Sequence, residues 1–464
     1  MHVVPNGSER KVAASDLFFS TTDRKGVIDG ANAVFCDYAR YSMDELLREP
    51  HNIIRHPDMP GGAFQIMWDL LLAGHPMGAY VKNLAHDGQT YWVFATITPL
   101  GDGFLSVRQA PCRSDLFAAA NALYAKVLPM ELAARSAGAS RIAAARLGAA
   151  ALAEGIQSLG FASYADFIRM AVPAEIRARR ELVTWTTPDP RDPSSGVTRD
   201  LIDAAIAVDQ ALDSQMSGLE ELEMLSGRLA QTSDQMEHSV ERLRSAVGAA
   251  VAASGEVSST EPVLGRVVGP LSAISQWLLE AIEDLRLRLA EVRGRISELR
   301  LRIALARLHD ETLAEFAREM AAGDAPDRAP VYVQQLCRAL EETATTAARE
   351  VVITNEGLRT LAQDLVEVER EMRTFQRQLA TWRLLIPRYR LSQRLDPFTE
   401  PIDAQLKSGL RQVSSVRQLA DQCLASSRPF DSGPLSQAVN AVVQARTQVE
   451  QELVQGRDLA PHVQ

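Results

Sequence analysis

Hydrophobic residues follow different patterns in the two parts of the chain. Residues 15–110 contain short apolar runs separated by Gly, Pro and other turn formers, whereas the residues after about 200 are rich in Ala, Leu, Glu, Arg and Gln. Short apolar runs between turn signals are typical of strands, and apolar positions that recur every three or four residues are typical of helices. We therefore expect a multidomain protein, with a mixed domain at 15–110 and long helices at 201–464.

The mixed domain is predicted to have the element order ββααα-βββ. The runs DLFFSTTD and KGVIDGAN form the first hairpin, and two short helices follow, the second with Ser42 as N-cap and Glu45 completing a capping box. A longer helix stops at Gly74, and three more strands follow, the first two joined by the turn HDGQ. This order predicts an α+β domain: an antiparallel five-stranded sheet with helices on one face.

The residues on either side of this domain are less regular. Residues 1–14 are expected to be a flexible N-terminus. Residues 111–200 begin with Ala-rich helical sequence and end in TTPDPRDPSSG, so we expect a helical connector followed by a Pro-rich break.

Two heptad patterns indicate a long α-helical coiled-coil hairpin in the second part. The repeated apolar positions are Leu285, Leu289, Val292, Ile296, Leu299 and Ile303, and then Leu358, Leu361, Leu365, Val368, Met372, Phe375, Leu379, Trp382 and Ile386. The run AAGDAPDRAP separates them, so the antiparallel hairpin should turn near 321–330. Two arms alone are narrow, so we expect a homodimer that forms a four-helix bundle; a plain dimerisation rod would show the same periodicity.

Composition excludes several classes of protein. The formal net charge is -10, so no overall field draws the protein to nucleic acid or anionic lipid. No apolar run approaches the ~20 residues of a membrane span, and the first residues lack the apolar core of a signal peptide, so we expect a cytoplasmic protein. The four Cys have no CxxC spacing, which argues against a disulfide framework or a zinc site.

Motifs for catalysis are missing from the sequence. It contains no GxxxxGK[ST], GxSxG or HExxH motif, so we do not expect an enzyme. LHDET at 308–312 superficially resembles a phospho-accepting histidine box, but no ATP-binding domain follows it. We therefore expect His309 to be a partly exposed helical histidine.

A polar cluster, NIIRHPDMP at 52–60, interrupts the apolar pattern of the first domain. Its two prolines suit a rigid loop in which Asp58 caps the following helix. Alternatively, Arg55 and His56 could hold a phosphate or the polar edge of a flavin through charge-assisted hydrogen bonds and stacking. The residues alone leave both interpretations open.

Residues 20–100 resemble the flavin-binding PAS domain of the bacterial aerotaxis receptor family. The shared elements are STTD, PHNIIRHPDMP, AFQIMW, VKN, YWV and TP, in this order and at matching spacing. The resemblance implies a PAS fold that binds FAD non-covalently, with the redox state of the flavin reporting oxygen or electron-transport status. It covers less than a fifth of the chain.

The same resemblance implies which residues bind the cofactor. They are Arg55, His56, Asp58, Asn32, Trp68 and Asn83. The first three would line or shape the FAD site, Asn32 and Asn83 would make polar contacts, and Trp68 would stack near the cofactor or serve as a core anchor. The chain departs from the family pattern at Met77 and Leu84, where the family usually has Trp and Arg.

Haem is the less favoured cofactor. Other PAS domains bind it through a His, and this domain offers His51, His56, His75 and His86.

After the break, Cys337, Arg338, Leu340 and the run AAREV at 347–351 take the places of the tip pattern of methyl-accepting chemotaxis proteins. The helical region thus resembles the signalling domain of that family, whose tip binds a histidine kinase and its adaptor. The first hypothesis is therefore a soluble, non-enzymatic redox or energy sensor that signals to such partners through a dimeric bundle. The second is a scaffold or dimerisation protein whose PAS domain has lost its ligand.

Overall fold

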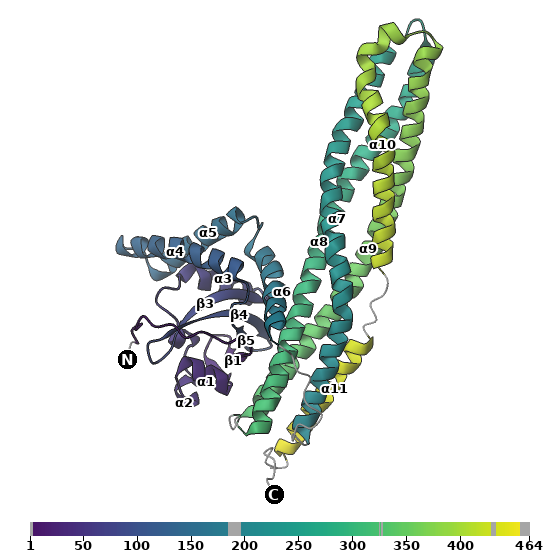
Figure 1. Cartoon of the computed structure of the whole chain (residues 1–464). Helices are drawn as coiled ribbons and strands as arrows, with labels where there is room; N and C mark the ends of the chain where they lie inside the picture. The colour runs from purple at the N-terminus through teal and green to yellow at the C-terminus, as the bar shows by residue number, and fades with distance from the viewer. Residues whose placement is uncertain (1–2, 184–195, 324, 326–327, 428–432, 455–464) are drawn as a thin grey trace. The chain divides into compact units, whose positions relative to one another are not determined.

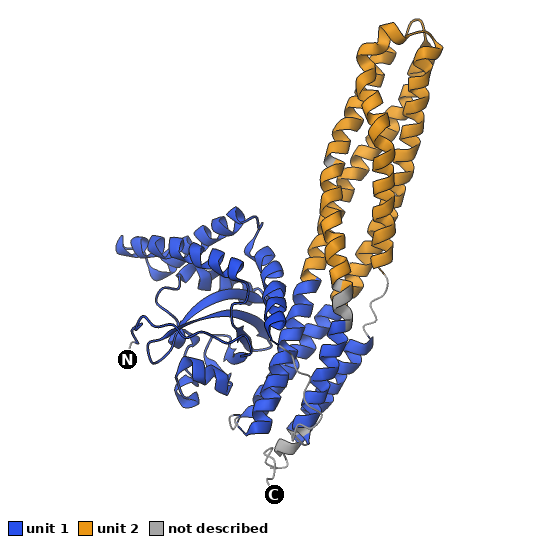
Figure 2. Cartoon of the chain, viewed as in Figure 1, with its two compact units in different colours: residues 1–214, 299–348, 431–464 blue, residues 215–298, 349–430 orange. Residues whose placement is uncertain are grey.

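The computed structural model describes residues 3–183, 196–323, 325, 328–427 and 433–454, and it divides into two compact units (Figures 1 and 2). Unit 1 combines described residues from 1–214, 299–348 and 431–464, and unit 2 combines those from 215–298 and 349–430. Most of the predicted Pro-rich break lies outside the described residues. No helix in the described part of the chain is both long and apolar enough to cross a membrane.

Five strands among the described residues form one antiparallel sheet in the order β2-β1-β5-β4-β3. They are β1 (Phe18–Asp23), β2 (Ile28–Ala31), β3 (Met77–Leu84), β4 (Thr90–Leu100) and β5 (Gly103–Gln109). Ser20 of β1 lies opposite Ser106 of β5, and Ile97 of β4 lies opposite the same Ser106. The predicted α+β domain with a five-stranded antiparallel sheet is confirmed.

Short helices cover one face of this sheet, which we call the inner face; the opposite face is the outer face. They are α1 (Ala33–Ala39), α2 (Met43–Leu46), the 3₁₀ helix η1 (His51–Ile54) and α3 (Gly61–Leu72). The predicted capping box at Ser42 and Glu45 is present. The main chain reverses after α3 at Gly74, whose φ of +82° favours glycine.

Alternation along the strands separates the two faces of the sheet. Phe18 points to the inner face, where it joins a buried cluster with Phe35 and Tyr91. Its neighbour Phe19 points to the outer face. Residues just before β1 also pair with the sheet region: the backbone N–H of Arg10, within the segment expected to be flexible, donates to the Thr90 carbonyl at 2.7 Å.

Three helices of the connector pack around the domain in unit 1. They are α4 (Ser114–Ser136), α5 (Arg141–Ser158) and α6 (Tyr164–Leu182). Helices α3 and α5 approach each other closely at Gly62 and Gly148, because a Cβ on Gly62 would lie 2.3 Å from backbone atoms of α5. On the outer face, the Tyr80 hydroxyl donates to the buried Glu175 carboxylate of α6 at 2.6 Å.

The remaining helices are long. They are α7 (Val197–Glu256), α8 (Pro262–Ala322), α9 (Ala329–Arg388), α10 (Ser392–Ser426) and α11 (Gly433–Val454). Within unit 1, the end of α8 and the start of α9 pack against the outer face of the sheet. Phe19 contacts the rings of Phe316 and Tyr332, with centroids 5.2 and 6.2 Å away. The sheet therefore has helices on both faces, one set from its own domain and one from distant sequence.

The expectation for His309 is wrong. Its side chain is completely buried, with Nε2 3.3 Å from the Thr98 hydroxyl and Nδ1 3.1 Å from the Thr343 hydroxyl. Burial lowers the pKa of His309 to about 4, so the imidazole is neutral near pH 7. The residue connects β4, α8 and α9, and has the character of a structural histidine rather than an exposed phospho-acceptor.

Unit 2 contains segments of four helices in its described part, from α7, α8, α9 and α10. Side chains from all four surround one small gap, namely Met236, Ile282, Val368 and Val416. Every predicted heptad position is buried, with at most 4% exposure, so the two apolar seams are confirmed. Because α7 and α10 supply the other two helices, one chain can bury these seams without a second copy.

Candidate functional site

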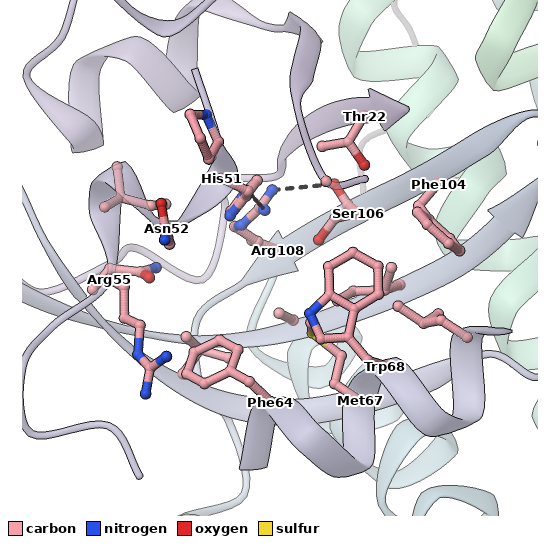
Figure 3. Close-up of a pocket in the computed structure, with 18 of the residues that line it drawn as sticks. Thr22, His51, Asn52, Arg55, Phe64, Met67, Trp68, Phe104, Ser106 and Arg108 are labelled. Carbon is pink, nitrogen blue, oxygen red and sulfur yellow. Dashed lines mark hydrogen bonds between the residues drawn. The ribbon is translucent and has the colours of Figure 1, made fainter. Parts of the chain in front are cut away.

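A cavity of about 300 Å³ lies between the inner face of the sheet, η1 and α3 (Figure 3). Small-molecule pockets usually measure about 300–1,000 Å³, so its size suits part or all of a small ligand. The polar side chains that line it are Thr22, Lys25, His51, Asn52, Arg55, Asn83, Ser106 and Arg108. The apolar lining comes mostly from α3 and the central strands.

Two aromatic residues of α3 form one wall of the cavity. Phe64 and Trp68 are four residues apart, and this spacing puts both rings on one side of the helix (Figure 3). Trp68 meets Phe104 edge to face, with centroids 5.7 Å apart. The Arg55 guanidinium lies 4.1 Å from the Phe64 ring centroid. This wall offers flat surfaces against which a planar ring system can stack.

The loop that contains Arg55 is held by the sheet and by its own main chain. Arg55 pairs with Asn83 of β3 in an isolated antiparallel bridge, and its guanidinium donates to the Met59 carbonyl at 2.8 Å. These contacts place Arg55 and Asn83 on the same side of the cavity.

Two buried polar atoms at the cavity have no hydrogen-bond partner among the described residues. They are Nδ2 of Asn83 and Oγ of Ser106, and both residues are at least 94% buried. A buried donor left unpaired costs about 1–3 kcal/mol. The cavity therefore suits an occupant with hydrogen-bonding groups along one edge.

Arg108 of β5 is a buried cation at the same cavity. Its guanidinium donates to Nε2 of His51 at 2.5 Å (Figure 3). It also donates to Oγ of Ser20 at 3.2 Å. Burial lowers the pKa of Arg108 to about 10, and burial with the nearby Arg108 charge lowers the pKa of His51 to about 3. At neutral pH the pair therefore consists of a charged guanidinium and an uncharged imidazole.

The charges around the cavity are all of one sign. Lys25, Arg55 and Arg108 are cationic, and no Asp or Glu occurs among the described lining residues. This arrangement favours an anionic or electron-rich ligand.

Three of the six residues proposed from the sequence line the cavity: Arg55, Trp68 and Asn83. Asn32, in contrast, is the N-cap of α1, where its side chain accepts from the backbone N–H groups of Phe35 and Phe19 at 3.3 and 3.1 Å. Asn32 lies outside the described cavity lining.

His56 and Asp58 also lie outside this lining and belong to the loop. Nδ1 of the buried His56 accepts from the Asp58 backbone N–H at 3.0 Å. The Asp58 carboxylate pairs with Lys82 at 2.8 Å, and that hydrogen bond lowers the pKa of Asp58. The alternative in which Asp58 caps α3 is wrong, because Pro60 occupies the N-cap position and has no side-chain hydrogen bond.

The sequence indicated His51 only as one of four possible haem ligands, and it did not indicate Ser106 or Arg108 as cofactor-binding residues. The signal for two of them was present in the run GFLSVRQA, because alternation puts Phe104, Ser106 and Arg108 on one face of β5. His51 had only a local signal, its position next to the NIIRHPDMP cluster.

Comparison with known proteins agrees with this fold. A family described as PAS fold matches residues 29–104. The aerotaxis receptor of Escherichia coli (strain K12) is 39% identical over 102 residues, which cover 21% of this chain and 20% of the receptor. The nitrogen fixation regulatory proteins of Klebsiella pneumoniae and Klebsiella oxytoca are 33% and 32% identical over 89 residues, which cover 19% of this chain and 18% of each relative.

The chain thus matches about a fifth of the length of these curated relatives. The residues that match this family comprise most of β2, the helices α1, α2, η1 and α3, the strands β3 and β4, and the first two residues of β5. Residues 29–104 therefore belong to a PAS domain similar to those of the aerotaxis receptor and the nitrogen fixation regulatory proteins.

Proposed function

We propose that this protein is a redox or energy sensor whose PAS domain binds FAD non-covalently at the cavity. The observation that supports this most directly is the combination of unpaired Asn83 and Ser106 groups with a lining that has cations and no described carboxylate. FAD has a planar ring with polar atoms along one edge and a negatively charged diphosphate. When bound, the flavin supplies a centre that accepts and releases electrons.

The residues have distinct roles in this proposal. Trp68 stacks on the ring, Asn83 and Ser106 pair with its polar edge, and Arg55 contributes positive charge. His56 and Asp58 hold the loop, and Asn32 holds the start of α1.

The two departures from the aerotaxis receptor pattern are compatible with the site. Met77 and Leu84 are buried, 3% and 5% exposed, and neither belongs to the described cavity lining. Their replacement of Trp and Arg therefore removes no lining group from this cavity.

FAD is favoured over haem by the surroundings of the histidines. His51 is the one histidine among the described lining residues, and its Nε2 accepts a hydrogen bond from Arg108. A haem iron would need a histidine nitrogen with a free lone pair, so iron binding at Nε2 would compete with this contact.

Spectroscopy of the purified full chain tests FAD binding. We expect a flavin absorbance spectrum, either as isolated or after incubation with FAD, and release of the flavin when the protein is denatured. Trp68→Ala should weaken FAD binding about tenfold, the equivalent of about 1.4 kcal/mol for a lost aromatic contact. Trp277→Ala, at a partly exposed tryptophan of α8, is the matched control and should bind like wild type.

A folded protein that takes up no FAD would contradict the sensor proposal and support the scaffold alternative. A Soret band would instead identify haem. Circular dichroism of every variant shows whether lost binding reflects lost folding.

For the output, we propose that the PAS domain acts through the helices on its outer face. The end of α8 and the start of α9 contact this face at Phe19, and His309 of α8 contacts Thr98, so a change in the sheet can alter the packing of these helices. The proposed partners are a chemotaxis-type histidine kinase with its adaptor, and a second copy of this chain.

A pull-down in oxidised and in reduced buffer tests binding to the kinase and adaptor. We expect the amount of kinase captured by this protein to differ between the two buffers. Equal capture in both states, or none, would contradict this route. Sedimentation of the full chain tests the homodimer, and a monomer at micromolar concentration would contradict it.

A further inference from the structure

We propose that Arg108 favours the reduced form of the bound ring and thereby sets the redox potential of the site; this inference rests on the proposed FAD site. Its basis is a buried cation whose described partners are all uncharged.

Arg108 is 3% exposed and makes contacts only with neutral groups among the described residues. It donates to His51, to the Ser20 hydroxyl and to the Ser106 carbonyl, at 2.5, 3.2 and 3.2 Å, and its guanidinium lies 4.9 Å from the Phe35 ring centroid. No described carboxylate lies within 4.0 Å of it. A buried charge without a counter-ion is costly, and a ligand that develops negative charge nearby offsets that cost.

The position of Arg108 suits an action on the ring edge. It lies on the same face of β5 as Ser106, whose hydroxyl has no described partner, and both residues line the cavity. His51 accepts from the guanidinium and so fixes its orientation without neutralising it. The charge is therefore in place before the ring changes state, as in other preorganised electrostatic sites.

The charge balance of reduction defines what Arg108 can do. Two electrons from an external reductant and one proton from solvent leave one net negative charge on a flavin ring, and no bond to the protein forms. The oxidised ring is neutral. A buried cation therefore stabilises the reduced form more than the oxidised form, which raises the potential.

Potentiometric titration of the FAD-loaded full chain with dithionite and indicator dyes tests this inference. Arg108→Gln should weaken binding of reduced FAD relative to oxidised FAD by at least about tenfold, which lowers the two-electron potential by about 30 mV. Arg108→Lys retains the charge and should keep most of the wild-type potential. Lys126→Gln, at an exposed lysine of α4, is the control for loss of one positive charge.

A second pair of variants leaves Arg108 in place. His51→Asp puts a carboxylate beside the guanidinium and should lower the potential, whereas His51→Asn supplies a neutral group and should shift it less. If Arg108→Gln does not fold, the comparison of these two His51 variants still tests whether the charge of Arg108 affects the potential.

The outcomes separate this inference from the proposed function. Wild-type protein that binds no FAD refutes the FAD site itself. Bound FAD with the same potential in Arg108→Gln and wild type, or in His51→Asp and His51→Asn, overturns the role of Arg108 alone. Reduced stability with an unchanged potential would show that the arginine has only a packing role against Phe35 and His51.

Discussion

The Glu131 carboxylate on α4 accepts the backbone N–H of Gly61, in the first turn of α3, at 2.6 Å. Its other oxygen accepts from Gly62 at 2.8 Å. Because the start of α3 has no side-chain cap of its own, this carboxylate satisfies two free donors and opposes the positive end of the helix dipole. The start of the helix that contains Trp68 thus depends on Glu131, which lies 70 positions after Gly61 in the sequence.

We therefore expect Glu131→Gln to reduce the free energy of unfolding by about 1–2 kcal/mol, because a charged cap is replaced by a weaker neutral acceptor. Urea denaturation measures the change. Glu154→Gln, at an exposed position of α5, removes the same charge and should leave the midpoint nearly unchanged. Equal midpoints for both variants would show that Glu131 does not stabilise α3.

Arg179 of α6 and Glu311 of α8 form a buried ion pair in unit 1, with Nη1 and Oε2 2.5 Å apart. Arg179→Met should cost about 3–5 kcal/mol, since it leaves part of a buried carboxylate uncompensated. Arg180 also pairs with Glu311, at 2.8 Å, which places the expected cost at the lower end of that range.

The double variant Arg179→Met with Glu311→Leu removes both charges and should be more stable than Arg179→Met alone. Thermal unfolding of the single and double variants gives the comparison. A double variant that is less stable than the single one would contradict this account of the pair.

Asp310 of α8 is completely buried, and neither carboxylate oxygen has a hydrogen-bond partner among the described residues. Burial raises the pKa of Asp310 well above its ordinary value, and the negative charges of Asp209 and Glu311 raise it further. The positive charges of Arg307 and Arg180 act in the opposite direction but do not cancel this increase. The folded protein therefore retains a proton that the unfolded chain loses above about pH 4. Its stability should fall as pH rises above that point, by up to about 1.4 kcal/mol per pH unit.

Asp310→Asn mimics the protonated carboxyl and removes this contribution. We expect the variant to be more stable than wild type at pH 8, with a smaller difference at pH 4, in urea titrations at both pH values. Asp102→Asn, in the exposed turn between β4 and β5, should instead give a curve parallel to that of wild type. If the free energy of unfolding of Asp310→Asn falls with pH as steeply as that of wild type, Asp310 is not protonated in the folded protein.

The Glu319 carboxylate of α8 accepts from the backbone N–H of Ala33 at 2.8 Å and from the Asn32 amide at 3.3 Å, at the start of α1. Glu319→Ala removes this contact, which should destabilise the start of α1 by about 1 kcal/mol and make the amides of α1 exchange faster with solvent. Hydrogen exchange followed by mass spectrometry measures the effect. Glu356→Ala, at an exposed site of α9, should leave α1 exchange unchanged, and an unchanged α1 in both variants would contradict the contact.

Local sequence signals were sufficient where neighbours in the chain determine the structure. Ser42 and Glu45 form their capping box within four residues, and the heptad positions are buried because helical periodicity places them on one face. Alternation in the strands likewise predicted the five-stranded sheet.

Distant contacts could not be predicted in the same way. Asp58 lies at the expected place for a cap, but Glu131 on another helix takes that role. His309 has the sequence context of an exposed histidine, yet two threonines from other elements enclose it. Arg108 was detectable as an inward-facing residue, whereas its lack of a described acidic partner depends on the packing around it.

The packing of Phe19 against Phe316 also bears on how the chain is made. The two residues are separated by about 300 positions, and translation proceeds at about 5–20 residues per second, so roughly 15–60 seconds pass between their synthesis. During that time the outer face of the sheet lacks the helices that bury Phe19. The nascent domain therefore presents an apolar surface at the ribosome, where chaperone binding would protect it until the end of α8 and the start of α9 emerge.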